Sequence, residues 1–251
     1  MEDKIMRAMV YDHTGKSHEL DLAAIPGLDI KPDPQFMDGE YLNIFTASHR
    51  VPDVWRYTIS SMEGAMRLHS IDRSDALPNS NYDDRPATDA IGTRVIQLVL
   101  ESPHTSEYTD NLVPKGPAQG TSVGDAGGAI EKYLHLVLKK IELPEGHFSI
   151  LVTNPIPYMC SLGRFTGSLV PAVRDSVWER IWAMPSFPKN FVSRTAMYLP
   201  EYVVNCCTTK LQPNVTESLK QSGIVTNIFE APHPAVQWNI HKENVRIVKV
   251  C

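Results

Sequence analysis

Long apolar segments are missing from the sequence. None of its 251 residues belongs to a continuous run of about 18 apolar side chains, the length that a membrane-spanning helix needs. The N-terminal stretch MEDKIMRAMVYDHTGK also lacks the apolar centre of a secretory signal peptide. We therefore expect a cytoplasmic protein that has no membrane partner.

Cysteine is scarce, and its spacing is unfavourable for a metal. The four cysteines, Cys160, Cys206, Cys207 and Cys251, form no C-x-x-C pair. Structural zinc and iron–sulfur sites usually take pairs of ligands from short loops. The sequence thus predicts reduced, mostly buried thiols, no metal site and no cofactor.

Basic residues do not outnumber acidic ones. The 24 Lys and Arg residues against 29 Asp and Glu residues give a formal net charge of −5. This balance counts against non-specific nucleic-acid binding but leaves room for a local basic face. With 42% hydrophobic and 21% charged residues, the composition is that of an ordinary globular protein, which we expect to be a monomer.

The pattern of the chain divides it into two parts. Residues 1–90 mix strand-like segments with turns, and the segment MRAMVYDHTGKSHELDL predicts two strands around residues 13–16. Residues 75–92, DALPNSNYDDRPATDAIG, are polar and rich in turn formers, which is typical of a linker. We interpret residues 1–90 as an N-terminal α+β extension packed on the core, and residues 91–251 as an α/β domain.

Strand and helix patterns alternate after residue 94. Continuous apolar runs predict four strands, at residues 94–101, 147–155, 201–207 and 224–234. Apolar residues at helical spacing predict three helices between them, at residues 125–143, 169–184 and 216–223. This alternation predicts a three-layer α/β sandwich with a central, mostly parallel four-stranded sheet and helices on both faces.

Polar residues gather where the predicted strands end. In open parallel sheets, ligands bind at the carboxyl ends of the strands. One shared site is therefore expected to collect the strand-end residues Glu101, Ser102, Pro103, His104, Asn154, Asn205 and His233.

The order of these motifs resembles the uracil-DNA glycosylase superfamily, over roughly residues 94 to 240. A short proline-closed segment ends the first strand of that superfamily, and residues 100–104, LESPH, correspond to it. The following glycine-rich loop corresponds to KGPAQGTSVGDAGG at residues 115–128. A base-reading asparagine and a His-Pro-Ser element come later, matched by Asn154 in SILVTNP and by His233 in FEAPHPA. The resemblance identifies the chain as a divergent member.

Several positions depart from the superfamily pattern. Ser102 stands where the best-known branch has a water-activating aspartate, while Glu101 matches the glutamate of another branch. That branch usually binds an iron–sulfur cluster, for which the cysteines here are wrongly spaced. Leu100 replaces a glycine, His104 replaces a tyrosine that crowds C5 of uracil, and the loop lacks a clear aromatic to stack on the base. These departures favour a wider pocket than that of a uracil enzyme.

The resemblance implies catalytic roles for Glu101 and His233. A carboxylate can orient water and stabilise an oxocarbenium-like sugar, and an imidazole can donate to the departing base. Each residue also has a structural alternative, since Glu101 can cap the next loop and His233 can be a core histidine. Glu107 and Asp125 are reserve carboxylates, and Asp125 fits better as a helix N-cap.

Further residues are expected to contact the substrate and the DNA. Contacts to the base or sugar are assigned to Ser102, Pro103, His104, Gln119 and Asn154, although Asn154 also fits a turn before Pro155. Val236, Gln237 or Trp238 would fill the gap left by a flipped base, although Trp238 fits a core position equally well. Candidate phosphate contacts are Arg164, Lys189, Arg194, Lys210 and Lys242.

The sequence therefore predicts a monofunctional DNA glycosylase. It would flip out and hydrolytically remove uracil or a C5-modified pyrimidine, such as hydroxymethylated or glucosylated cytosine, in DNA repair or phage defence. The alternative is a non-catalytic binder of modified or single-stranded nucleic acid on the same fold. An unrelated α/β hydrolase is disfavoured because no G-x-S-x-G elbow is present.

Overall fold

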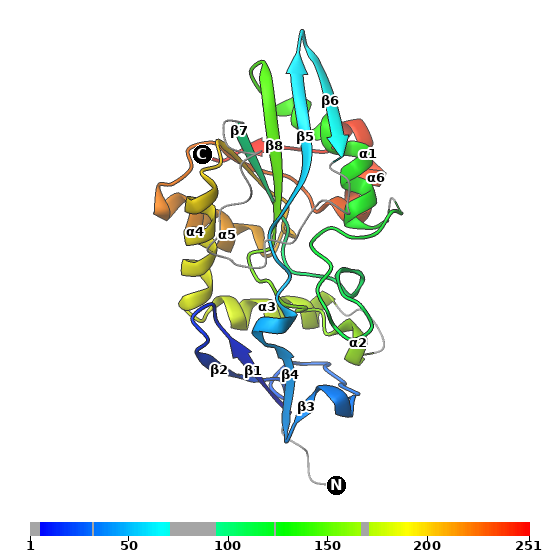
Figure 1. Ribbon diagram of the computed structural model, residues 1–251, viewed down its shortest axis with the longest axis vertical. Helices are drawn as coiled ribbons and strands as arrows, with labels where there is room; N and C mark the ends of the chain where they lie inside the picture. The colour runs from blue at the N-terminus through cyan, green and yellow to red at the C-terminus, as the bar shows by residue number, and fades with distance from the viewer. Residues whose placement is uncertain (1–5, 32, 71–93, 123, 167–170) are drawn as a thin grey trace.

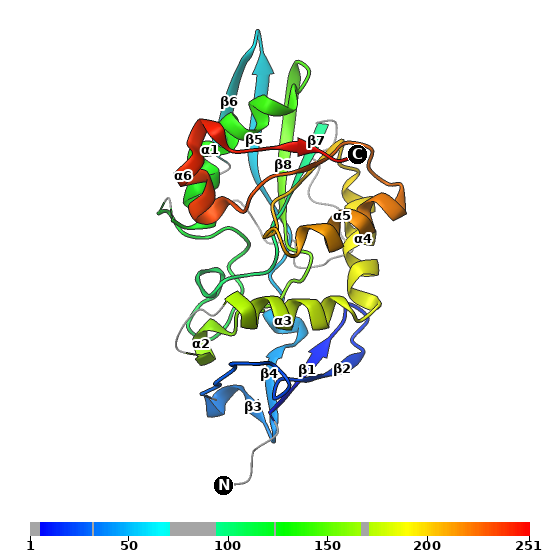
Figure 2. The same ribbon diagram turned by 180° about the vertical axis from the view of Figure 1, so that it is seen from behind.

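Two β-sheets and the helices around them make up the described part of the protein (Figures 1 and 2). The computed structural model describes residues 6–31, 33–70, 94–122, 124–166 and 171–251. The predicted linker at residues 75–92 lies outside these ranges. The prediction of an α/β fold is confirmed.

The larger sheet has seven strands in the order β11-β10-β9-β7-β8-β5-β6. Its centre, β10-β9-β7-β8, is parallel, and the strands added at both edges are antiparallel. The bounds are β5 Val54–Met62, β6 Ala65–Ser70, β7 Arg94–Val99, β8 Gly146–Thr153, β9 Tyr202–Asn205, β10 Ile228–Glu230 and β11 Val248–Lys249.

The prediction of a four-stranded sheet is wrong, although the four predicted strands form the parallel centre. Strand β5, from the segment interpreted as an extension, pairs along β8, and β11 pairs with β10. An uncovered edge would leave backbone N–H and C=O groups unpaired. Antiparallel strands pair with both edges of the parallel centre, β11 with β10 and β5 with β8. Strand β6 pairs in turn with β5, so both β5 and β6 belong to the large sheet.

The smaller sheet is built from the first 45 residues, in the order β2-β1-β4-β3. The two strands predicted around residues 13–16 are confirmed as β1 and β2. The bounds are β1 Arg7–Tyr11, β2 Ser17–Asp21, β3 Met37–Asp38 and β4 Tyr41–Phe45.

Helices cover both faces of the large sheet. On one face, α1 packs with Trp238 and Val245 against β7 and β8, and on the other face α3, α4 and α5 share a core with Val99 and Val203. The three predicted helices are confirmed as α1, α3 and α5, whereas α4 is not predicted. The bounds are α1 Ala126–Leu138, α2 Gly163–Thr166, α3 Pro171–Trp182, α4 Ser186–Tyr198, α5 Gln212–Ser222 and α6 Asn239–His241.

Helix α3 lies between the two sheets. Both views show it running across the lower ends of the central strands, with the smaller sheet on its other side (Figures 1 and 2). Leu42 of β4, Val177 of α3 and Val99 of β7 belong to one continuous buried cluster. Helix α3 is therefore packed between the smaller sheet and the carboxyl end of β7, where the candidate site lies.

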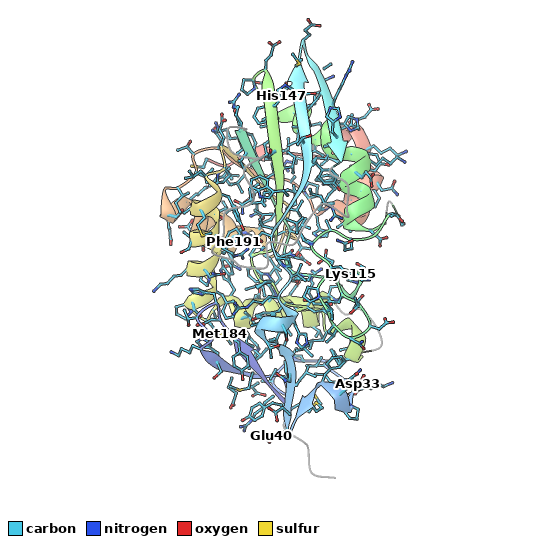
Figure 3. All side chains as sticks on the ribbon, in the orientation of Figure 1. Asp33, Glu40, Lys115, His147, Met184 and Phe191 are labelled. Carbon is cyan, nitrogen blue, oxygen red and sulfur yellow. The ribbon has the colours of Figure 1, made fainter. Side chains whose placement is uncertain are left out.

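Arg194, a candidate phosphate contact, is buried in the core instead. It belongs to α4, which also turns Phe191 toward the interior (Figure 3). Its side chain pairs with the Asp53 carboxylate at 2.5 Å and donates to the Asn154 carbonyl oxygen at 2.9 Å. The Tyr198 hydroxyl donates to the same carboxylate at 3.1 Å. The prediction that Arg194 contacts a phosphate is wrong, because its side chain is buried. Its contacts with Asp53 and Asn154 join α4 to the start of β5 and to the end of β8.

Replacing Arg194 is expected to destabilise the protein strongly. Arg194→Met leaves the Asp53 carboxylate buried without its cation, which costs on the order of 3–5 kcal/mol. Urea unfolding followed by circular dichroism measures the loss. Lys189→Met, an exposed change on the same helix, is the matched control and should stay within about 0.5 kcal/mol. Equal stability of the two variants would contradict the structural role of the ion pair.

Candidate functional site

A cavity of about 560 Å³ opens at the carboxyl end of β7, and we call it the strand-end cavity. It lies between the loop that follows β7, the start of α1, the start of α3 and the segment that follows β10. Lys115 extends from the loop beside it on the outer side of the molecule (Figure 3). The predicted site residues that line it are Glu101, Ser102, Pro103, His104, Gln119, His233 and Gln237.

Glu101 is anchored in the cavity wall by three contacts, two from α3 and one from the segment after β9. Its side chain is only 5% exposed, and its Oε1 forms an ion pair with Nη1 of Arg174 at 2.8 Å. Its Oε2 accepts a hydrogen bond from the backbone N–H of Thr208 at 3.1 Å. The indole N–H of Trp178 donates to its backbone carbonyl at 2.9 Å. Glu101 therefore both caps a loop, as its structural alternative requires, and presents a negative charge to the cavity.

His233 reaches the same cavity from the segment after β10. Its side chain is half-buried, and within the described residues no hydrogen bond to its imidazole is found. Burial lowers the pKa of His233 below its ordinary value. The Glu101 carboxylate opposes this shift, whereas Arg174 and His104 lower the pKa further. The imidazole is consequently neutral near pH 7 and available to a ligand.

Glu107, a reserve carboxylate, joins two loops of the cavity wall. It is buried, accepting from the backbone N–H of Ala118 at 2.5 Å and from that of His104 at 3.1 Å. Arg56 of β5 donates to the Ala118 carbonyl oxygen at 3.1 Å. Burial raises the pKa of Glu107 to about 8, despite the opposing backbone hydrogen bonds and the nearby Arg56. These contacts explain Glu107 as a loop anchor.

The glycine-rich loop packs closely on the start of α1. A Cβ atom on Gly127 would lie 2.2 Å from the Ala118 carbonyl oxygen, and one on Gly128 would lie 2.2 Å from that of Ser122. Only glycine allows this approach. Asp125 precedes the helix in the N-cap position, but its side chain makes no capping hydrogen bond and lines the cavity instead.

Two predicted strand-end residues do not line the cavity. Asn154 is 2% exposed, and within the described residues both polar atoms of its side chain lack a hydrogen-bond partner. It follows Thr153, whose carbonyl accepts from the N–H of the cavity residue Leu100, so it lies next to the cavity wall. Asn205 is buried and donates to the Gln212 carbonyl oxygen at 3.0 Å, which ties β9 to α5.

The residues predicted to contact DNA are scattered. Trp238 is fully buried and donates to the Pro232 carbonyl oxygen at 2.8 Å, so the core alternative holds for it. Gln237 is exposed at the cavity, and Lys210 is exposed but paired with Glu179 at 3.0 Å. Lys189 and Lys242 are exposed. The side chains of Arg164 and Val236 lie outside the described part.

The cavity residues that the sequence does not reveal include Ser161, Arg174 and Thr208. Ser161 is 3% exposed, and within the described residues its hydroxyl has no partner. Arg174 lies in the first turn of α3, where the helix dipole disfavours a cation. That unfavourable position is a signal, readable in the sequence, that the arginine has a specific acidic partner.

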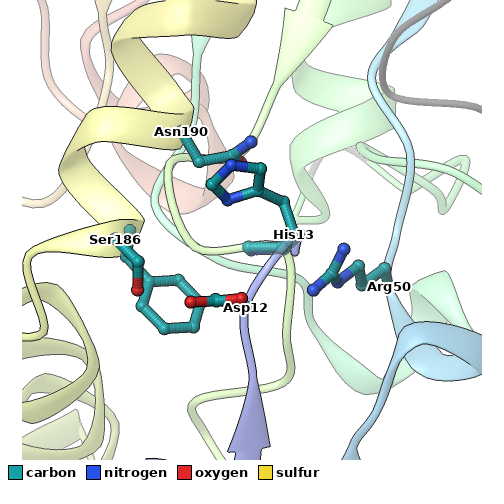
Figure 4. A pocket seen from close by; sticks show the side chains of 7 residues that line it. Asp12, His13, Arg50, Ser186 and Asn190 are labelled. Carbon is teal, nitrogen blue, oxygen red and sulfur yellow. The ribbon is translucent and has the colours of Figure 1, made fainter. Parts of the chain in front are cut away.

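A second hollow among the described residues is much smaller than the strand-end cavity. The hollow around Asp12 and Ser186, between the β1–β2 turn and α4, holds about 10 Å³, enough for about one water molecule (Figure 4). Burial alone would raise the pKa of Asp12, but hydrogen bonds from Thr14, His18 and Ser186 lower it well below its ordinary value. The side chains around this hollow thus form a closed structural network.

Within the described ranges, no group of three or more His, Cys, Asp or Glu side chains is arranged to hold a metal ion. No described helix combines the length and apolar character needed to cross a membrane. All four cysteines are free thiols, and all but Cys251 are buried.

No protein-family model, curated protein or solved structure matches the chain. Its function is therefore inferred from the strand-end cavity and the motifs that line it.

The contribution of Glu107 to the stability of the protein is expected to fall as the pH rises from about 5 to 8. The folded state holds a proton on Glu107 up to a pH of about 8, whereas the unfolded state releases it near the ordinary pKa of 4.5. Between these values the folded state binds the extra proton, so Glu107 lowers the free energy of unfolding by about 1.4 kcal/mol per pH unit. Urea unfolding at several pH values measures this slope.

Glu107→Gln is the comparison that isolates this slope. The amide cannot titrate, so the variant should lose the Glu107 contribution while the histidines keep theirs. The variant is also less stable at low pH, because its NH₂ group faces a backbone donor. Parallel pH profiles of wild type and variant would show that Glu107 does not carry the dependence.

Proposed function

We propose that the chain is a monofunctional DNA glycosylase, which removes uracil or a C5-modified pyrimidine from DNA and leaves an abasic site. The observation that carries the proposal is that Glu101 and His233, from the ends of two parallel strands, line one cavity of about 560 Å³. We further propose that the protein acts as a cytoplasmic monomer, in DNA repair or phage defence. The resemblance of the strand-end motifs to the uracil-DNA glycosylase superfamily supports this choice of reaction.

The size of the cavity supports a substrate larger than uracil. Sites for small molecules commonly occupy about 300–1,000 Å³, and the strand-end cavity falls within this range. A flipped nucleotide has to enter such a pocket because the bond to be broken is buried in the duplex. The proposal places a substituent on C5 of the pyrimidine beside His104 and Gln119, which line the cavity.

The charges of the site match those that develop in glycosidic hydrolysis. Water adds to the sugar carbon, the bond to the base breaks, the base leaves with the electron pair, and the proton released by the water ends on the base. The sugar becomes positive in the transition state, which the fixed carboxylate of Glu101 stabilises. The base becomes negative, and the neutral imidazole of His233 donates a hydrogen bond to its oxygen.

Unused hydrogen-bonding groups support binding of a polar base. Within the described residues the hydroxyl of Ser161 and the amide of Asn154 have no partner. Buried polar atoms normally have at least one, whether protein, water or ligand. Ser161 lines the cavity, so its hydroxyl is suited to bind the edge of a pyrimidine, whereas Asn154 lies behind the cavity wall.

A non-catalytic binder of modified or single-stranded nucleic acid is the second candidate. The observation that favours it is that both carboxylate oxygens of Glu101 already have protein partners, Arg174 and Thr208. A binder of this kind retains the cavity but forms no abasic site. Tight binding of an oligonucleotide without cleavage would select this candidate.

Glu101→Gln is expected to abolish most of the excision activity. The amide has the size of the carboxylate but lacks the charge, and loss of such a group typically costs about 100-fold or more in rate. Abasic sites are counted on duplexes containing uracil, hydroxymethylcytosine or glucosylated cytosine. Glu179→Gln, on the exposed side of α3, is the control and should keep full activity. Full activity of Glu101→Gln would remove Glu101 from the mechanism.

His233→Ala is expected to lower the single-turnover rate by about 100-fold, because a hydrogen bond to the departing base is lost. His233→Gln should recover part of the rate, since its amide can still donate. The wild-type rate should show no fall between about pH 7 and pH 8.5 on account of His233, because its pKa lies below its ordinary value and the ring is already neutral. A rate for His233→Ala equal to that of the wild type would contradict the assigned role.

A further inference from the structure

Helix α3 holds Glu101 with two side chains that lie one helical turn apart. Arg174 binds the carboxylate at 2.8 Å, and the indole of Trp178 binds the backbone carbonyl at 2.9 Å. Trp178 is fully buried, and its ring stacks on that of Trp182 with centroids 4.9 Å apart. The smaller sheet packs behind α3, so the helix is a rigid platform for the end of β7.

The guanidinium of Arg174 is itself fixed from several sides. Its Nε and Nη2 donate to Oδ1 of Asp175 at 3.0 and 2.7 Å, and its Nη2 lies 3.5 Å from the hydroxyl of Thr208. Its side chain is only 17% exposed, and it lines the strand-end cavity. A planar guanidinium held in this way can define the direction of a carboxylate, which a flexible ammonium group cannot do as well.

We propose that Arg174 is a positioning residue that keeps the Glu101 carboxylate in place for catalysis. This inference rests on the proposed glycosylase function. Arg174 and the Thr208 N–H occupy one carboxylate oxygen each, so Glu101 acts mainly through its fixed negative charge and by orienting water. Arg174 touches Glu101, and its effect on the reaction passes through that residue.

The electrostatic surroundings of Glu101 explain why a positioning cation is needed. The buried thiols of Cys160 and Cys207 lie near enough for the charge of Glu101 to raise their pKa values, and neither thiol carries a positive charge that could stabilise the carboxylate. Arg174 is the cation that contacts the carboxylate within the described residues. The titratable or charged groups near Glu101 are Arg174 and Asp175 of α3, Cys160, Cys207, His233 and, farther along the cavity wall, His104.

A double-mutant cycle tests the inference. Arg174→Ala should lower the single-turnover rate by about 100-fold, the scale expected when a catalytic group is misplaced by about 1 Å. In the Glu101→Gln background, the same change should have little further effect, because Arg174 acts through Glu101. Arg174→Lys should recover part of the rate. Arg180→Ala, an exposed arginine on the same helix, is the control and should leave the rate unchanged.

Binding and structure separate positioning from a loss of folding. The affinity for a duplex carrying an uncleavable base analogue should change less than about threefold in Arg174→Ala, so that the loss falls on the chemical step. A crystal structure of this variant should show the Glu101 side chain in a new position. An unmoved Glu101, an unchanged rate, or additive effects in the cycle would each overturn the inference.

The proposed function can fail separately. If the wild-type protein removes no base from any modified duplex, the glycosylase proposal is refuted, and with it the catalytic part of this inference. The crystal structure of Arg174→Ala then still decides whether Arg174 holds Glu101 in place.

Discussion

The ion pair between Glu101 and Arg174 joins the end of the central strand β7 to helix α3. Both partners are largely shielded from water, so breaking the pair would leave a charge in a poorly solvated place. Helix α3 therefore fixes the position of Glu101 after the strand, and α3 itself packs on the apolar residues of the smaller sheet. The site is in this sense a product of the whole fold, including the first 45 residues.

Buried polar contacts fix the other strand ends in the same way. Arg194 and Asp53 secure the end of β8, and the Asn205 side chain secures β9 against α5. Glu107 holds together the two loops that wall the cavity. Such groups are costly to bury, but once satisfied they admit few alternative arrangements. A cavity built this way keeps its shape before a ligand arrives, which favours both binding and catalysis.

The sequence predicts the centre of the fold well and its edges poorly. Continuous apolar runs such as RVIQLVLE identify buried parallel strands, because both faces of those strands are covered. Helix α4, SFPKNFVSRTAMY, lacks a clear apolar stripe and contains a proline, so its pattern resembles a loop. Its omission explains why Arg194 was placed on the surface. Pairing of β5 with β8 joins residues 85 to 98 positions apart in sequence, from Ser61 with Gly146 to Val54 with Val152, which local patterns cannot show.

The candidate site is predictable where strand topology decides and not where packing decides. Glu101 and His233 meet because parallel strands end on the same side of the sheet. Trp238 and Asn205 carry equally polar or aromatic side chains next to strand ends, yet packing against α1 and α5 buries them. Arg174 comes from a helix, so strand-end reasoning passes over it.

The most direct test of the central claim is a crystal structure of the protein with a DNA duplex that carries a 2′-fluorinated, cleavage-resistant modified cytidine. The account predicts that this nucleotide leaves the duplex, with its base in the strand-end cavity against His233 and its sugar beside Glu101. A base that stays stacked in the duplex, or that binds elsewhere on the protein, would contradict the account.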